Sequence, residues 1–424
     1  MLKRAKKYYS NSEFTRNVVT LMTGTTIAQA IPIAISPILT RIYTPDDFGV
    51  LALFMAITAI TGAISNAKYE QAIILPKNNN NSINILVLGI AISFLFSLFL
   101  LIIVVIFDEK IAILLGNIKI KNWLYFVPIS TLFLGIFNSL NFYNIRHKKF
   151  KNIAKSQVTK STSLAITQIG IGFFKNGPFG LILGQIMSYL SGNYMLFKTL
   201  KNTENYKKVI NNNDIKKLSK KYKKFPFFSL PSVFLNVINL NLMNILISSF
   251  FSVTTLGFFS LTQRIIGIPS RVIGNSLSQV YFQKATQEYH NTGKTYRVFI
   301  KTLKKLVIIG FPIFLILFFI AEPTFAFVFG EKWRIAGTYA KILVPFAFIR
   351  FVSSSLSNTI DVHQVQQVGL IINLILLLTV IISFYFAKIF NISFIHLLLF
   401  YSVILSIEYI IFIYLYFIIS KSKK

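Results

Sequence analysis

The sequence predicts an all-α polytopic membrane protein with about twelve transmembrane helices. Hydrophobic residues make up 54% of the 424-residue chain and charged residues only 13%, which is more apolar surface than a water-soluble domain could cover. These residues are gathered into stretches long enough to cross a hydrocarbon core of roughly 30 Å as helices. Every second connection between the stretches is basic. Lipid is therefore expected to be the solvent of most of the chain.

The predicted spans follow one another along the whole sequence. Pro32 and Pro37 predict kinks in the first span. The run Thr44-Pro45-Asp46-Asp47 before the second is typical of an N-cap, an N1 proline and first-turn acids. In chain order, the spans are residues 18–40, 47–67, 83–107, 122–145, 156–174, 178–197, 226–250, 255–283, 299–321, 336–360, 365–387 and 392–419.

Alternate connections carry most of the Lys and Arg residues. Such a bias in short loops fixes orientation, with the basic loops on the cytoplasmic side, so both termini are expected to be cytoplasmic. We interpret the loop charges as topology signals and anchors for lipid phosphates rather than as a chemical site. They are Lys3, Lys6 and Lys7; Arg146, Lys148, Lys149, Lys151 and Lys155; and Lys216, Lys217, Lys220, Lys221, Lys223 and Lys224.

A long polar connection near the middle of the chain predicts two lobes of about six helices each. Short motifs recur in corresponding spans, such as Val127-Pro128 and Val344-Pro345. The interface of two such lobes would form a central cavity. The predicted parts are a cytoplasmic N-terminal segment 1–17, an N-lobe 18–197, a basic cytoplasmic linker 198–225, a C-lobe 226–419 and a cytoplasmic tail 420–424.

Polar side chains form stripes inside several predicted spans, and these stripes cannot all face lipid. A guanidinium at mid-membrane costs at least about 2.5 to 3.5 kcal/mol, so arginines there should face a wet cavity or an acid. Acids are scarce at that depth, and Glu408 is the main candidate partner. The arginines therefore suit an anion, whose oxygens a guanidinium can bind in pairs. The candidate substrate-binding residues are Arg264, Arg271, Asn275, Arg350, Gln29 and Asn236, and the candidate coupling or gating acids are Glu70, Asp361 and Glu408.

A purely structural interpretation of these stripes stays open. Ser, Thr and Asn side chains commonly join transmembrane helices by hydrogen bonds, and arginines can snorkel to the interface or bond to carbonyl groups. Arg264 and Arg271 are the harder pair to explain in this way, because they lie two turns apart on one face.

Several classes of function are not indicated. The chain has no cysteine, and its four histidines show no ligand spacing, so no metal and no cofactor is expected. No P-loop, nucleophile elbow or carboxylate pair stands out, which argues against an enzyme. The net charge of +31 lies between the spans and not on an RNA-stacking motif, so nucleic acid is not an expected partner.

A family resemblance is carried by four motifs, which are residues 36–49, 68–77, 148–150 and 180–185. Together they resemble the bacterial polysaccharide and O-antigen flippases of the multidrug/oligosaccharidyl-lipid/polysaccharide exporter superfamily. The resemblance implies a two-lobed transporter in the bacterial cytoplasmic (inner) membrane that moves an undecaprenyl-diphosphate-linked sugar repeat unit from the inner to the outer leaflet, for O-antigen or capsule. A polysaccharide polymerase is an expected partner, and Glu70 is carried over from the family pattern.

Three other classes of membrane protein are alternatives to a polysaccharide flippase. A multidrug exporter of the same superfamily would need an acidic cavity for cationic drugs, whereas the predicted cavity is basic. A membrane-embedded glycosyltransferase or O-antigen polymerase would show a long periplasmic loop. A peptidoglycan-precursor flippase is closest in chemistry, but its family typically has two more spans. The sugars carried, the coupling ion and the oligomeric state stay open.

Overall fold

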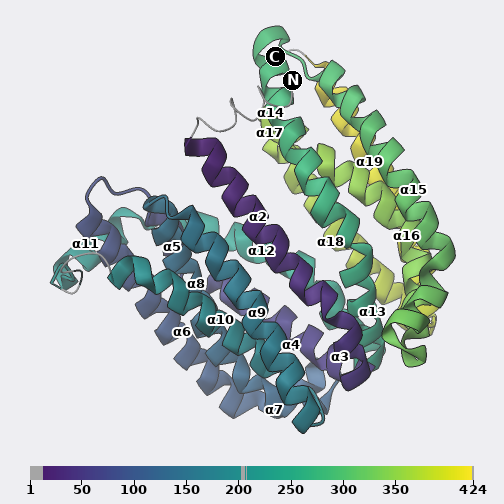
Figure 1. Ribbon diagram of the computed structural model, residues 1–424, viewed down its shortest axis with the longest axis horizontal. Coiled ribbons are helices and arrows are strands. Elements are labelled where there is room, and N and C mark those ends of the chain that lie inside the picture. Colours follow the sequence, from purple (N-terminus) through teal and green to yellow (C-terminus); the bar gives the residue numbers. More distant parts are fainter. Residues whose placement is uncertain (1–12, 202–205, 207, 423–424) are drawn as a thin grey trace. The chain divides into compact units, whose positions relative to one another are not determined.

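The computed structural model describes residues 13–201, 206 and 208–422. These residues form long helices joined by short connections, with no strand anywhere in the described part of the chain (Figure 1). The predicted basic segment that holds Lys3, Lys6 and Lys7 lies outside the described residues. The chain is an all-α polytopic membrane protein, as its composition predicts.

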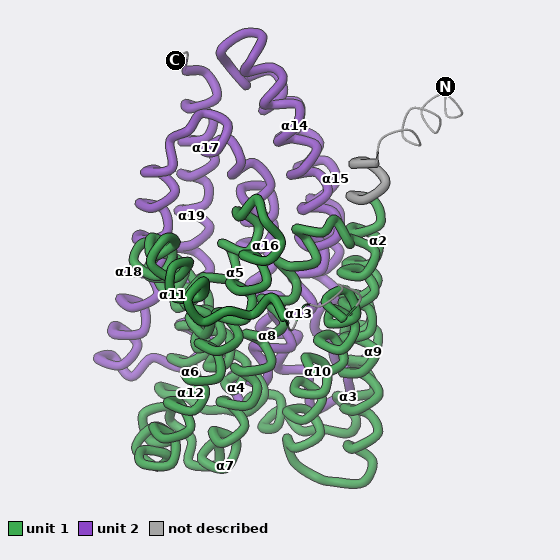
Figure 2. The backbone as a smooth tube through the Cα atoms, turned by 90° about the vertical axis from the view of Figure 1, so that its left-hand side faces the viewer, with its two compact units in different colours: residues 1–253 green, residues 254–424 purple. Residues whose placement is uncertain are grey.

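The chain packs as two compact units, residues 1–253 (unit 1) and residues 254–424 (unit 2) (Figure 2). The boundary of packing lies later in the chain than the predicted linker 198–225, because the helix Leu230–Phe250 packs against the helix Pro45–Ile64 within unit 1. The division into an N-lobe and a C-lobe at the linker stays a prediction.

Unit 1 contains the helices of the first seven predicted spans, which lie side by side, and several short helices at their ends (Figure 1). Its elements are α2 (Glu13–Ala34), α3 (Ser36–Ile42), α4 (Pro45–Ile64), α5 (Tyr69–Ala72), α6 (Asn79–Leu114), η1 (Ile118–Ile120), α7 (Lys121–Leu124), α8 (Phe126–Arg146), α9 (Phe150–Phe174), α10 (Phe179–Lys201), α11 (Asn212–Lys221), η2 (Phe225–Ser229) and α12 (Leu230–Phe250).

Unit 2 contains the helices of the last five predicted spans, of which α15 packs on α16 and α16 on α19. Its elements are α13 (Val253–Ile266), η3 (Ser270–Gly274), α14 (Asn275–Thr292), α15 (Tyr296–Phe329), η4 (Glu331–Trp333), α16 (Arg334–Leu356), α17 (Thr359–Val362), α18 (Gln366–Ile389) and α19 (Phe394–Lys421).

Each predicted span coincides with a helix or with a helix broken once. Nine helical stretches of the described residues are long and apolar enough by themselves to cross a membrane. The helices α9 and α10 and the stretch α13 to α14 are more polar, but they are also long and occupy predicted spans. The first span is broken at Ile35, with Pro32 inside α2 and Pro37 at the start of α3. The predicted kinks are thus confirmed.

The start of α4 forms the predicted cap. The Thr44 side chain accepts a hydrogen bond from the Asp47 backbone N–H, and the Asp47 carboxylate accepts one from the Thr44 backbone N–H at 2.9 Å. Pro45 and Asp46 complete the first turn. This reciprocal capping satisfies two amide groups that would otherwise lack partners at the helix start.

The linker helix α11 docks onto unit 1. The Tyr69 hydroxyl donates to the Ser219 carbonyl at 2.9 Å, and the Asn84 carboxamide accepts from the Asn211 backbone N–H at 3.0 Å. Leu218 is only 6% exposed and belongs to the apolar core of the unit. In both views α5 and α11 lie at one end of unit 1 and α7 at the opposite end (Figures 1 and 2). The helix α11 is therefore an integral part of the basic end of unit 1.

We expect Gly49→Ala to destabilise the protein by about 1 to 3 kcal/mol, because a Cβ at this position would lie 1.9 Å from the Val253 carbonyl oxygen, and backbone cannot yield cheaply. The matched control is Gly170→Ala in α9, where a Cβ would meet nothing within 4 Å. Alanine there should leave stability unchanged or raise it by up to about 1 kcal/mol. Thermal unfolding of both variants in detergent measures the difference. Equal melting temperatures would contradict the close packing at Gly49.

Candidate functional site

The candidate arginines of α13 and η3 lie at a break in the predicted eighth span. After α13 ends at Ile266, the chain passes Pro269 and makes one π-helical turn before α14 begins. The Arg271 guanidinium folds back on α13, with its Nε donating to the Gly267 carbonyl at 3.3 Å and an Nη donating to the Arg264 carbonyl. Gly267 has no side chain to obstruct this contact, since a Cβ there would lie 3.2 Å from the guanidinium. The two arginines are thus joined at one bend.

The bend is fixed on α16. Gly274 closes the π-helical turn, and a Cβ there would lie 3.3 Å from the Phe351 ring. The Ser355 hydroxyl donates to the Gly274 carbonyl at 3.4 Å, and the Asn358 carboxamide donates to the Ser278 hydroxyl at 3.0 Å. These contacts bury one face of η3 and α14 against α16. They leave the face that carries Arg271 outside this packing.

The predicted polar faces of α14 and α16 are exposed within unit 2. Arg271 and Asn275 are exposed, and so are Arg350 on α16 and Asp361 on α17, while Arg264 is half-buried. The Arg350 guanidinium lies 5.9 Å from the centre of the Phe346 ring. Among the described residues, neither Arg271 nor Arg350 has a carboxylate within 4.0 Å. Neither guanidinium is therefore neutralised by an acid of the described residues, although Arg271 also donates to backbone carbonyls.

The expectation that Glu408 pairs with an arginine is wrong within the described part of unit 2. The Glu408 carboxylate instead accepts a hydrogen bond from the Thr379 hydroxyl, which joins α19 to α18. Its second oxygen, Oε2, is buried and has no hydrogen-bond partner in the described residues. Thr379 provides an uncharged donor, so the carboxyl group stays available to a proton or a cation.

The candidate residues of unit 1 are dispersed. Gln29 is half-buried on α2, and Asn236 is exposed on α12. Neither side chain makes a hydrogen bond with another residue in the described ranges. The structure does not bring these two amides together with each other or with Glu70.

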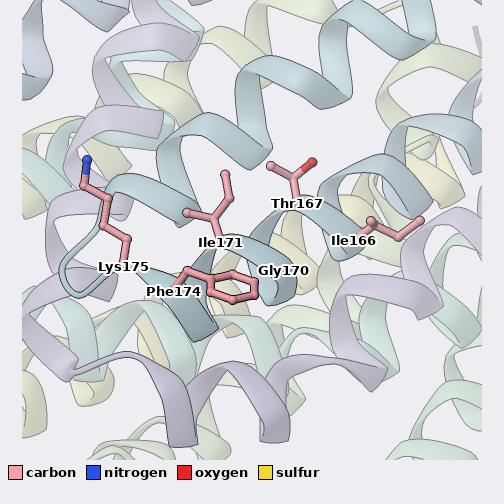
Figure 3. A pocket seen from close by; sticks show the side chains of 6 residues that line it. All are labelled: Ile166, Thr167, Gly170, Ile171, Phe174 and Lys175. Carbon is pink, nitrogen blue, oxygen red and sulfur yellow. The ribbon is translucent and has the colours of Figure 1, made fainter.

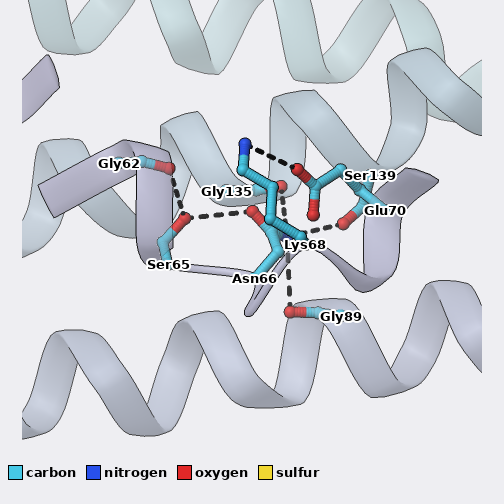
Figure 4. A network of polar contacts seen from close by, with 8 residues as sticks. All are labelled: Gly62, Ser65, Asn66, Lys68, Glu70, Gly89, Gly135 and Ser139. Carbon is cyan, nitrogen blue, oxygen red and sulfur yellow. Dashed lines mark hydrogen bonds and ion pairs between the residues drawn. The ribbon is translucent and has the colours of Figure 1, made fainter. Parts of the chain in front are cut away.

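Glu70 lies in a buried polar network between α4, α6 and α8 (Figure 4). Its side chain is 3% exposed, and its Oε1 accepts from the Lys68 ammonium at 3.2 Å. Oε2 has no hydrogen-bond partner among the described residues. Beside the pair, the Asn66 carboxamide donates to the Ser139 hydroxyl at 2.7 Å and to the Gly135 carbonyl at 2.9 Å. Glu70 thus forms a buried ion pair with Lys68.

Burial raises the pKa of Glu70 above its ordinary value of 4.5, and the Lys68 ammonium opposes that rise without cancelling it. The cause is desolvation, because the second carboxylate oxygen gives up water and receives no hydrogen bond in return. The folded protein therefore holds a proton on Glu70 more tightly than the unfolded chain does.

Lys160 is a charged residue that the sequence analysis overlooked. It lies on α9, inside the predicted span 156–174, and its side chain is half-buried. Its ammonium lies 4.0 Å from the centre of the Phe137 ring and 4.8 Å from that of Tyr189. A lysine inside an otherwise uncharged predicted span was the signal that could have revealed it.

A shallow hollow lies along one face of α9, near its end (Figure 3). Its volume is about 620 Å³, and none of the predicted site residues lines it. The lining is mainly apolar, so it offers few groups that could recognise a charged ligand. It consists of Ile166, Thr167, Gly170, Ile171, Phe174 and Lys175.

We expect the stability of the wild-type protein to fall as the pH rises from 4.5 towards the raised pKa of Glu70, because over that window the unfolded chain loses this proton first. Glu70→Gln cannot ionise and should remove this part of the pH dependence. Melting temperatures at about pH 5 and about pH 8 measure it in both proteins. Glu109→Gln, whose side chain is 66% exposed, is the control. The same pH dependence in wild type and Glu70→Gln would contradict this origin.

A family described as "Polysaccharide biosynthesis protein" matches residues 38–338 of the chain. The teichuronic acid biosynthesis protein TuaB of Bacillus subtilis (strain 168) is 27% identical over 126 residues, 30% of this chain and 26% of that protein. The succinoglycan biosynthesis transport protein ExoT of Rhizobium meliloti (strain 1021) is 21% identical over 329 residues, 76% of this chain and 64% of that protein. The chain thus spans less than two thirds of the length of either relative.

Solved structures with the same fold include two transporters. An inward-facing multidrug resistance MATE family transporter of the MOP superfamily has a TM-score of 0.68, 14% identity and coverage of 93% of each chain. The lipid II flippase MurJ in an inward closed conformation has a TM-score of 0.72 and 15% identity, covering 94% of this chain and 86% of that one.

The family match extends over most of the chain and includes the N-terminal motifs, the helix α9 and the arginine-bearing bend. The two solved transporters share this fold. The family match confirms the family resemblance found in the sequence. The chain therefore belongs to the family of polysaccharide biosynthesis proteins.

Proposed function

We propose that the protein is a flippase that moves an undecaprenyl-diphosphate-linked oligosaccharide repeat unit from the inner to the outer leaflet of the bacterial cytoplasmic membrane. The product would serve a surface polysaccharide such as O-antigen or capsule. Family membership and the transport function in the printed name of ExoT support the class of cargo. The printed name of MurJ supports a lipid-linked substrate, and its 15% identity to this chain shows a shared fold only.

The observation that carries this proposal is the exposed cationic face of unit 2. Arg271 and Arg350 lie on neighbouring helices, with no carboxylate near either in the described residues. Inside a membrane protein, an un-neutralised guanidinium is costly unless water or an anion reaches it. A diphosphate or an acidic sugar provides oxygens that match the guanidinium geometry. In this proposal Arg264, Arg271 and Arg350 hold the anionic part of the head group, and amides such as Asn275, Gln29 and Asn236 bond sugar hydroxyls.

The charges of the connections support the proposed orientation of the protein in the membrane. The basic end of unit 1, which carries α11 and the connection after α8, would be cytoplasmic, and so would both termini. The head group would enter from that side and leave on the other by alternating access. A polysaccharide polymerase would take up the translocated unit.

The strongest competing function is a multidrug exporter on the same fold. A cation-binding site should present carboxylates, whereas the exposed stripe of unit 2 carries arginines, with Asp361 at one end. A peptidoglycan-precursor flippase is the alternative that shares the anionic cargo. Transport of a lipid-linked repeat unit against lipid II, measured in the same vesicles, separates these two.

We expect Arg271→Ala to reduce surface polysaccharide on the order of tenfold or more in a strain that depends on this chain, with lipid-linked repeat units accumulating on the cytoplasmic side. The reason is loss of a charge-assisted hydrogen bond, which contributes about 1.5 to 3 kcal/mol. Arg271→Lys should restore part of the export because it keeps the charge. Quantifying surface polysaccharide and lipid-linked intermediates in cells checks this.

The control for Arg271→Ala is Arg297→Ala, an exposed arginine in the first turn of α15. Because Arg271 also bonds the α13 carbonyls, membrane insertion and melting temperature are measured for each variant. Normal export by a well-folded Arg271→Ala protein would contradict a binding role for this side chain.

We expect Glu408→Gln to abolish any dependence of transport on a pH gradient. Its carboxylate has one buried oxygen with no hydrogen-bond partner in the described residues, so it can accept a proton or hold a cation there. Transport by reconstituted vesicles with and without an imposed gradient tests this role. Asp361→Asn and Glu70→Gln are the comparison variants, since these acids are the other coupling or gating candidates. Unchanged gradient dependence in Glu408→Gln would remove it from consideration.

A further inference from the structure

Lys160 projects from α9 into the seam between α8 and α10. Its aliphatic stem packs on Gly192, where a Cβ would lie 2.6 Å from the lysine Cγ. Its ammonium then lies between two rings, 4.0 Å from the centre of Phe137 on α8 and 4.8 Å from that of Tyr189 on α10. Gly192 therefore makes the space that the lysine occupies.

The ammonium does not reach towards the basic end of unit 1. Phe137 lies more than two helical turns before Arg146, where α8 ends, and Tyr189 lies more than two turns before Lys198 near the end of α10. A lysine near a membrane surface normally extends towards the head groups to keep its charge in water. Lys160 holds its charge at the level of Phe137 and Tyr189 instead.

The rings satisfy this charge only in part. A cation over an aromatic face is attracted to the ring, and more strongly when it is desolvated. The three N–H groups of an ammonium also need acceptors, however, and a ring face is a weak one. In the described residues, no carboxylate or other oxygen of the protein bonds to Lys160. The described protein groups therefore provide no oxygen acceptor for the N–H groups of this ammonium.

Two amide oxygens on the helices that flank the lysine lack donors in the described residues. Asn193 adjoins Gly192, is 8% exposed, and donates to the Phe133 carbonyl at 2.9 Å, but its Oδ1 is buried and has no hydrogen-bond partner in the described residues. Asn141 lies one turn beyond Phe137 on α8, and its Oδ1 is also buried, with no hydrogen-bond partner in the described residues. Tyr189 already accepts a hydrogen bond from the Gln185 carboxamide at 3.0 Å. In the described residues, the seam thus contains an ammonium with no oxygen acceptor, and its helices carry two amide oxygens with no donor.

A ligand that complements this seam carries an oxyanion for the Lys160 ammonium. We propose that Lys160 binds an oxyanion of the translocated saccharide head group, and that the seam of α8, α9 and α10 is a second recognition site, in unit 1, for that head group. This inference rests on the proposed flippase function. The oxyanion is either the carboxylate of an acidic sugar or an oxygen of the diphosphate.

Binding to the full-length protein in detergent tests the proposal, with wild type, Lys160→Met and Lys160→Arg. Methionine keeps a long unbranched stem and removes the charge, whereas arginine keeps the charge. Lys198→Met is the matched control, because Lys198 also lies over a ring, 5.1 Å from the centre of Tyr194, but is exposed at the end of α10. The probes are methyl glucuronide against neutral methyl glucoside, and undecaprenyl diphosphate against undecaprenol.

We expect Lys160→Met to weaken the binding of an anionic probe on the order of tenfold, as loss of a charge-assisted hydrogen bond implies. Binding of the neutral probes should not change, and Lys160→Arg and Lys198→Met should stay near wild type. Weakened binding of the glucuronide identifies a sugar carboxylate as the ligand, and weakened binding of undecaprenyl diphosphate identifies the diphosphate. Wild-type affinity of Lys160→Met for both anionic probes overturns the proposal, and so does a failure of wild type to bind either.

Melting temperature separates recognition from a structural role. Without ligand, a recognition lysine carries an unmet charge, so Lys160→Met should be as stable as wild type or more so. A variant that melts earlier and still binds both anions identifies the lysine as a tie between helices, and overturns the proposal. Export in cells keeps the two claims apart. Failure of the wild-type chain to export surface polysaccharide overturns the proposed flippase function. Full export by Lys160→Met overturns only the site at Lys160.

Discussion

The structure depends on the requirement that each backbone N–H and C=O in hydrocarbon be bonded within the protein. The described residues meet it with helices, and at two helix ends side chains take the place of missing backbone bonds. At the break after α13, the substitute is the Arg271 guanidinium, which donates to carbonyls of the preceding helix. At the start of α4, it is the reciprocal cap of Thr44 and Asp47. The cationic face of unit 2 is thus connected to the backbone, so ligand binding at Arg271 would compete with the end of α13.

Charges inside this protein are accommodated in two ways. The pair of Lys68 and Glu70 is buried, and beside it the Asn66 carboxamide bonds α6 and α8, which suits a structural role for this region. Arg271, Arg350 and Lys160 instead lack acid partners among the described residues. Removing an unmet charge should not cost stability, so Arg350 and Lys160 are explained better by a ligand than by the fold, whereas Arg271 also bonds carbonyl groups of α13. The difference between the two groups is a physical criterion for separating structural from functional charges in such a chain.

Much of the fold could be predicted, because hydropathy, proline position and capping are local properties of the sequence. The spans, the kinks near Pro32 and Pro37 and the cap at Thr44 follow from neighbouring residues alone. The packing of α12 with α4 and the bond between Thr379 and Glu408 depend on contacts between distant segments, which a single sequence does not encode visibly. The depth and spacing of the arginines in the sequence indicated the roles proposed for them. The backbone carbonyls that Arg271 bonds could not be predicted in this way. Lys160 was missed because one lysine near the start of a span looks like an interfacial residue.

The turn between α4 and α5 illustrates how one position can serve two needs that disagree. Ala67 and Lys68 have φ angles of 49° and 62°, in the left-handed region where a residue other than glycine costs of order 1 to 3 kcal/mol. Glycine at position 68 would relax the backbone but leave Glu70 without its cation. Glycine at position 67 would relax the backbone and keep the ion pair. Selection for thermal stability alone would therefore favour glycine at position 67, whereas position 68 would keep lysine for its charge.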